Sequence, residues 1–116
     1  MKIRRFNESV VDEDILREIC YDITDNKEFF ITIDPWENYT QYKIAIRSTD
    51  VLHTERTGQS WLVTTEMEEV LLRLEDYLGE KHIKTAIYTD KFIWLDTKRT
   101  KLKPNTKVLA IYIIYK

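Results

Sequence analysis

The sequence has few of the residues on which several kinds of chemistry depend. Cys20 is the single cysteine, so no internal disulfide and no cysteine-based zinc site can form, and a lone thiol is typical of the reducing cytosol. With only Gly58 and Gly79, the chain lacks a Gly-rich phosphate-binding loop. No apolar run approaches the ~18 residues of a membrane span. We therefore expect a cytoplasmic protein without a membrane segment.

The charge balance shows no large excess of either sign. The net charge of −2 creates no overall field that would draw the protein onto nucleic acid or anionic lipid, so a nucleic-acid role would need a local basic patch. Charged residues make up 33% and hydrophobic residues 43% of the chain, which is typical of a globular protein. At this length we expect residues 1–116 to form a single domain with a usable core.

Catalytic and metal-binding signatures are also missing. Asp50, His53 and Glu55 could supply some metal ligands from one segment, but a metal site needs three or four ligands that converge. Cys20 falls on an apolar helical stripe, which is typical of a core residue. Ser60 does not have a glycine on both sides, as the serine of a nucleophile elbow does. We predict a protein with no cofactor or metal that is not an enzyme.

Two segments have the 3.6-residue apolar spacing of amphipathic helices. The first is predicted over residues 8–25, with a capping box at residues 9–12. The second starts at a capping box over residues 65–68 and ends at Gly79, where a helix C-terminal glycine belongs. Each helix has one apolar stripe and so needs one apolar surface on which to pack.

Six other segments alternate in polarity or are rich in β-branched and aromatic residues, which predicts strands. These segments are residues 28–34, 41–47, 60–64, 83–89, 92–95 and 108–115. The Asp-Pro-Trp-Glu-Asn sequence at 34–38 is typical of a turn, so the first two strands should form a hairpin. Asp90 and Lys91 mark a tight turn between the fourth and fifth strands.

The element order is helix, three strands, helix, three strands, which predicts an α+β fold. Because each helix has a single apolar stripe, we expect both on one face of a mainly antiparallel sheet of five to six strands. The residues expected in the core are Ile15, Ile19, Ile23, Ile31, Ile33, Ile44, Ile46, Leu71, Leu74, Leu78, Ile87, Ile111 and Ile113.

The last predicted strand, residues 108–115, is apolar on both faces. A half-buried strand alternates between apolar and polar residues, and this one does not. Helices should cover one of its faces. The other face calls for a partner protein, a second copy of the chain, or a central position under long loops.

This pattern predicts an interaction surface of aromatic and aliphatic side chains. The leading interpretation is a non-enzymatic protein–protein interaction or accessory module, expected to be homodimeric. An aromatic turn after the first strand is a further candidate, because exposed Trp and Tyr are frequent interface anchors. The alternative is that the rings of this turn fold over the end of the helical layer. The candidate surface consists of Phe92, Trp94, Tyr112, Ile114, Trp36 and Tyr39.

The segment 98–107 is basic and contains no acidic residue. Its cations could contact phosphates while neighbouring aromatic rings stack on bases, which predicts a nucleic-acid-binding protein as the alternative function. A solvated loop whose lysines deter edge-to-edge aggregation is the structural alternative. The candidate contacts are Lys98, Arg99, Lys101, Lys103 and Lys107.

The opening segment, Met-Lys-Ile-Arg-Arg-Phe-Asn-Glu at 1–8, resembles the start of small uncharacterised accessory proteins of tailed bacteriophages. The helical patterns at 15–25 and 71–78 are similar in style to theirs. The resemblance implies a virus or a virus-rich environment as the source, and an accessory role in the cytoplasm of a bacterial host. It brings no catalytic motif, so it implies no site residue.

Overall fold

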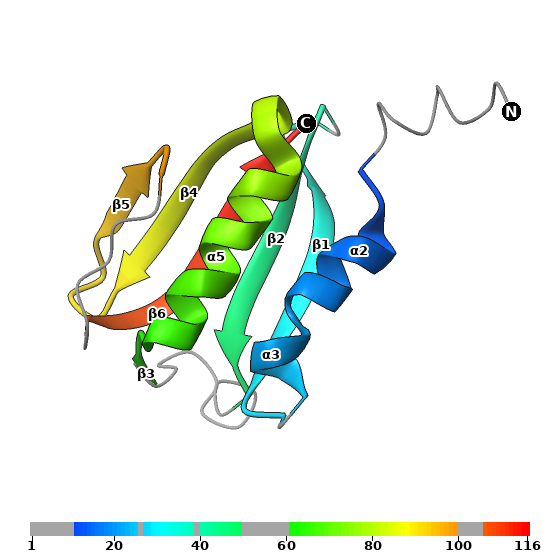
Figure 1. Ribbon diagram of the computed structural model, residues 1–116. Coiled ribbons are helices and arrows are strands. Elements are labelled where there is room, and N and C mark those ends of the chain that lie inside the picture. The colour runs from blue at the N-terminus through cyan, green and yellow to red at the C-terminus, as the bar shows by residue number, and fades with distance from the viewer. Residues whose placement is uncertain (1–10, 26, 39, 50–60, 100–105) are drawn as a thin grey trace, which may run out of the picture.

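The structure, a computed structural model, describes residues 11–25, 27–38, 40–49, 61–99 and 106–116 (Figure 1). Its helical elements are α2 (Glu13–Ile19), α3 (Tyr21–Thr24), α5 (Thr65–Leu78) and the 3₁₀ turn η1 (Gly79–Lys81). Its strands are β1 (Phe29–Trp36), β2 (Gln41–Ser48), β3 (Trp61–Leu62), β4 (His82–Thr89), β5 (Trp94–Thr97) and β6 (Lys107–Tyr115). The predicted α+β class is confirmed.

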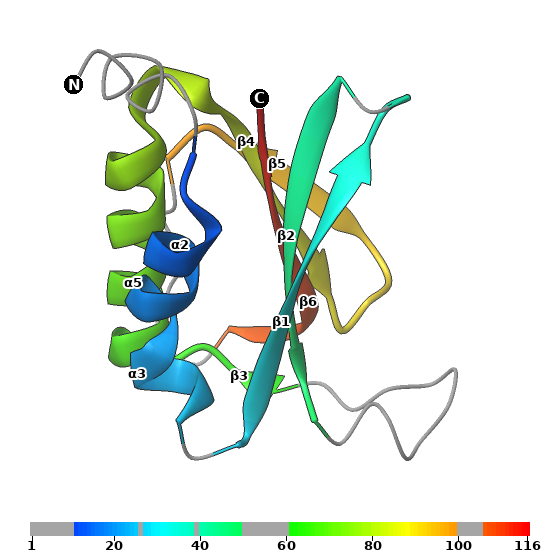
Figure 2. The same cartoon turned by 90° about the vertical axis from the view of Figure 1, so that its right-hand side faces the viewer.

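Within the described residues, six strands form one antiparallel sheet. Five of them follow the order β1-β2-β6-β4-β5, and β3 pairs with one end of β6. The helices α2, α3 and α5 all lie on the same face of this sheet, as Figure 2 shows. The two-layer arrangement follows from the single apolar stripe of each helix.

The final strand, β6, is central in the sheet and pairs with β2 on one side and β4 on the other. Its side chains at 111, 113 and 115 face the helices and join the hydrophobic core. Ile113, for example, lies opposite Ile44 of β2 and Thr85 of β4. Strand β6 is therefore apolar on its helix-facing side because it forms the floor of the core.

The first helical segment differs from the prediction in three ways. The helix begins at Glu13 rather than at residue 8, because Asp12 is the N-cap and its carboxylate accepts the Asp14 amide at 2.9 Å. Residues 1–10 lie outside the described part of the chain. The helix is also broken into α2 and α3 at Cys20. Ile15 was expected in the core and is 37% exposed, whereas its neighbour Leu16 is fully buried.

The second helix confirms the prediction except at its first residue. Thr64, not Thr65, is the N-cap, and its hydroxyl accepts the Met67 amide at 3.1 Å. Gly79 ends α5 with a φ of 57°, in the left-handed region that glycine tolerates best. The helix buries Leu71 and two further leucines against the sheet.

The strands differ from the prediction mainly at the two hairpins. The strand β1 continues through Pro35 and Trp36, which were expected in the turn. Proline is tolerated there because β1 is an edge strand. The fifth strand starts at Trp94, two residues later than expected, because Phe92 has a φ of 63° and belongs to the turn. The Thr89 amide closes this hairpin by donating to the Ile93 carbonyl at 2.9 Å.

Candidate functional site

The face of the sheet opposite the helices, here called the open face, carries no helix of the described residues (Figure 2). Strand alternation places aromatic, charged and small side chains there together. The side chains on this face include Asp34 and Trp36 of β1, Lys43, Ala45 and Arg47 of β2, Ala110, Tyr112 and Ile114 of β6, Lys84, Ala86 and Tyr88 of β4, and Trp94 and Asp96 of β5.

Five aromatic rings form a connected cluster across the open face. Tyr88 stacks on Trp94 with centroids 4.6 Å apart, and Trp94 lies 4.8 Å from Tyr112. Trp36 meets Tyr112 edge-on at 6.5 Å, and Phe92 meets Tyr88 edge-on at 6.1 Å. These separations lie in the range of favourable aromatic pairs. The cluster therefore links β1, β4, β5 and β6, which are not all neighbours in the sheet.

Two cations of β2 lie over the rings of this cluster. The Lys43 ammonium is 4.5 Å from the centroid of Trp36 and 4.4 Å from that of Tyr112. The Arg47 guanidinium is 5.1 Å from the Tyr112 centroid, and it also donates a hydrogen bond to the Tyr112 hydroxyl. Burial and the nearby positive charge of Arg47 lower the pKa of Lys43, while Asp34 opposes this shift. The chain thus uses its own cations to cover these rings.

This arrangement shields the second face of β6 without a partner. Ile114 is only 2% exposed and Ala110 only 5%, although both face away from the helices. The apolar character of β6 on both sides is therefore explained within one chain. A partner is not needed to cover this strand, contrary to one of the readings of its sequence.

A shallow cavity of about 330 Å³ opens on the same face. Its lining includes the rings of Trp36, Trp94 and Tyr112. Lys84 and Asp96 also line it and form an ion pair with 3.1 Å between the Lys84 Nζ and the Asp96 carboxylate. Because both side chains are about half exposed, this pair contributes little to stability.

The predicted partner surface is brought together by the fold, but its members differ in accessibility. Trp36, Trp94 and Tyr112 belong to the aromatic cluster, and Phe92 lies at its outer end. Ile114 lines the cavity but is only 2% exposed, so it offers a partner almost no surface. Tyr39 lies outside the described residues.

Among the described residues, the most exposed run of apolar side chains is 92–95, here called the apolar hairpin. Phe92 is 67% exposed, Ile93 53%, Trp94 44% and Leu95 50%. Residues 92–95 were predicted to form a strand, but Ile93 and Leu95 were not assigned to the candidate partner surface. The signal was present, because residues 92–95 are apolar at consecutive positions and so cannot all face one covered side of a strand. Figure 1 shows β5 beyond the area that α5 covers, so Leu95 stays exposed on the helix side of the sheet.

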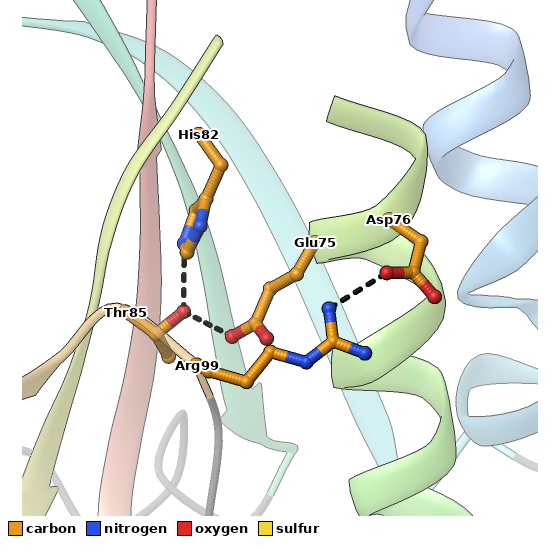
Figure 3. A network of polar contacts seen from close by, with 5 residues as sticks. All are labelled: Glu75, Asp76, His82, Thr85 and Arg99. Atoms are coloured by element: carbon orange, nitrogen blue, oxygen red, sulfur yellow. Dashed lines mark hydrogen bonds and ion pairs between the residues drawn. The ribbon is translucent and has the colours of Figure 1, made fainter. Parts of the chain in front are cut away.

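The basic segment has two of its cations bound to the protein itself. The Lys98 ammonium donates to the backbone carbonyls of His82 and Ile83. The Arg99 guanidinium pairs with Asp76 of α5 at 2.6 Å (Figure 3). Lys107 is exposed at the start of β6. Lys101 and Lys103 lie outside the described residues.

A buried polar network lies beside the Arg99–Asp76 pair (Figure 3). The Thr85 hydroxyl donates to the Glu75 carboxylate at 2.6 Å, and the His82 Nε2 is 3.0 Å from the same hydroxyl. Since the hydroxyl hydrogen points to Glu75, His82 donates to Thr85. Burial lowers the pKa of His82, with opposing charge effects from Glu75 and Lys98. All three side chains are buried, so the network joins α5 to β4 rather than presenting a reactive group to solvent.

Other reactive groups are also held in inert environments. Burial raises the pKa of the Cys20 thiol to about 12, so the thiol stays protonated and unreactive at neutral pH.

The described residues hold no group of three or more His, Cys, Asp or Glu side chains that could bind a metal ion. In the same part of the chain, every helix is too short or too polar to cross a membrane.

No protein-family model matches this sequence, and no curated protein or solved structure is significantly similar to it.

Proposed function

We propose that this chain is a non-enzymatic interaction module that forms a homodimer through its apolar hairpin. The observation that carries this proposal is the exposure of four consecutive apolar side chains at residues 92–95. Their contiguity matters, because single exposed apolar residues are ordinary on a protein surface, whereas a contiguous patch is typical of an interaction site.

Side chains on the open face hold part of the apolar hairpin in a fixed position. Trp94 is held between Tyr88 and Tyr112, with ring centroids at 4.6 and 4.8 Å. A ring fixed in this way loses little conformational entropy when a partner packs against it. The aromatic cluster therefore presents Trp94 in a preorganised position, as interface anchors require.

Nucleic-acid binding through stacked bases is less favoured by the same geometry. Tyr112 already lies under Lys43 and Arg47, and Trp94 already stacks on Tyr88. A base would have to displace these contacts before it could stack. Phosphates would likewise have to compete with the contacts that Lys98 makes with the backbone.

The test is the molar mass in solution over a wide range of protein concentration. A contact made by one short hairpin is smaller than a standard interface of ~1,600 Å², so the dimer is expected to be weak and visible only as concentration rises. Light scattering or sedimentation should show the mass rising from one chain towards two.

Matched variants locate the contact. The double substitution Ile93→Ser and Leu95→Ser removes exposed apolar surface from the hairpin, and we expect it to keep the protein monomeric at concentrations where the unaltered chain dimerises. Leu62→Ser is the control, since Leu62 is comparably exposed, at 46%, on β3. A strictly monomeric unaltered chain, or dimerisation that survives the double substitution, would refute the proposal.

A further inference from the structure

The outer edge of β5 carries backbone groups that no described strand pairs with. We propose that β5 pairs antiparallel with β5 of a second copy, with Leu95 opposite the partner's Leu95. This inference rests on the proposed homodimer and specifies how it is built. It predicts one continuous sheet through both chains, with all helices on one side and both open faces on the other.

The hydrogen-bonding pattern of the β4–β5 hairpin shows which groups point outwards. The Thr89 amide donates to the Ile93 carbonyl, so this opposed pair is hydrogen-bonded. In an antiparallel ladder, hydrogen-bonded and non-hydrogen-bonded pairs alternate. Leu95 and Thr97 therefore direct their backbone groups towards β4, whereas Trp94 and Asp96 direct theirs away from the sheet.

Because Trp94 and Asp96 both direct their backbone groups outwards and lie two positions apart, two copies of β5 can pair with each other about a two-fold axis. An axis at Leu95 sets Trp94 of one chain opposite the partner's Asp96, and the reverse, so each pair can exchange two backbone hydrogen bonds. The axis stands perpendicular to the sheet, which keeps opposed side chains on the same face. Leu95 then packs against the partner's Leu95 on the helix side, where it is 50% exposed in the single chain.

The neighbouring register is disfavoured by charge. Shifting the axis by one residue would set Asp96 opposite the partner's Asp96, and directly opposed like charges destabilise a sheet. Shifting it the other way would bring Phe92 into the ladder, but Phe92 has a φ of 63° and is not in extended conformation. The axis at Leu95 avoids both conflicts.

The opposite edge of the sheet is protected, which favours β5 as the pairing edge. Strand β1 contains Pro35, which has no amide hydrogen to donate, and the exposed carboxylate of Asp34 beside it. Such features are typical of edges that avoid pairing. Strand β5 contains no proline and begins with two apolar residues, Trp94 and Leu95.

Cysteine cross-linking tests the register. With Leu95→Cys, the two introduced thiols should lie in a non-hydrogen-bonded pair with Cα atoms ~4.5 Å apart, within disulfide range. With Asp96→Cys the two Cα atoms should be about 8 Å apart, because each cysteine lies one residue beyond the axis along its strand. This distance is too long for a disulfide. We expect mild oxidation to give a covalent dimer from Leu95→Cys and at least tenfold less from Asp96→Cys. The buried Cys20 does not compete.

Amide hydrogen exchange of the unaltered chain provides a second measurement that does not depend on a tolerated substitution. The Trp94 and Asp96 amides should exchange more slowly as the dimer fraction rises, while the Leu95 and Thr97 amides are protected at all concentrations. Cross-linking from Asp96→Cys, or a dimer in which the Trp94 and Asp96 amides exchange as in the monomer, would overturn the pairing and leave the homodimer standing. A chain that stays monomeric by mass would overturn both.

Discussion

At the level of single residues, burial follows the helical and strand periodicity closely but not perfectly. Ile44, Ile111 and Ile113 were expected in the core and are fully buried. Ile15 was also expected there, yet it is exposed while the adjacent Leu16 is buried. Both residues lie on the apolar stripe of α2. The stripe is wider than the surface that α2 packs against, so a residue at its margin stays exposed to solvent.

This difference predicts unequal effects of two neighbouring substitutions. Leu16→Ala should lower the free energy of unfolding by ~2–5 kcal/mol, because it removes a fully buried side chain and leaves a cavity. Ile15→Ala should cost less than about 1 kcal/mol, since Ile15 is 37% exposed. Urea unfolding of both variants measures the two values. Equal losses would show that α2 buries a different face from the one described.

At the level of elements, the sequence predicted most starts and ends to within one or two residues. The strand β2, the glycine at the end of α5 and the helix–strand order are as expected. The break at Cys20 was not predicted, because the apolar stripe continues across it from Leu16 to Ile23. The spacing of apolar residues therefore shows which side of a helix is buried but not where the helix is interrupted.

The contact between α5 and β4 has a consequence for pH. Burial lowers the pKa of His82 below its usual 6.5, so on the acid side of 6.5 the unfolded chain binds more protons than the folded one. Stability should therefore fall as the pH drops through about 6.5 towards the folded-state pKa, and this part of the loss should then level off.

The measurement is urea unfolding over a series of pH values, with His82→Gln as the comparison. Glutamine can still donate a hydrogen bond to Thr85 but cannot be protonated. Carboxylates contribute to acid destabilisation in both proteins, so the difference between the two curves isolates His82. Curves that stay parallel from neutral pH to below pH 6 would contradict the lowered pKa.

At the level of the whole molecule, the two layers leave one sheet face and one sheet edge available. The aromatic cluster and the cations of β2 partly cover the face, whereas the apolar hairpin at the β5 end remains exposed. The exposed apolar side chains at residues 92–95 therefore lie at one edge of the sheet. This distribution supports the proposed edge-to-edge pairing of two sheets through β5.

The distribution of charge does not favour binding to nucleic acid. The net charge is −2, and Lys98 and Arg99 contact groups within the protein. We expect no salt-dependent binding of single-stranded oligonucleotides when fluorescence anisotropy is measured at low and at moderate salt. Binding at low salt that weakens steeply as salt is added would be evidence for phosphate contacts and for the alternative function.

The sequence by itself determined the element order, the α+β class and most of the core, because periodicity, capping residues and turns depend on neighbours within a few positions of each other. The aromatic residues at 36, 92, 94 and 112 were also recognisable as interaction candidates from their type alone. Their joining into one cluster required Tyr112 to meet Trp94 and Trp36, which lie 18 and 76 positions before it in the chain.

Only the tertiary structure decided which candidates remain accessible. Ile114 is covered by its neighbours, and Lys98 and Arg99 bind the end of α5 and the start of β4, whereas Ile93 and Leu95 are exposed. The physical reason is that accessibility depends on which strands lie at the centre and at the edge of the sheet. That order is set by pairing between distant segments, and no local pattern encodes it.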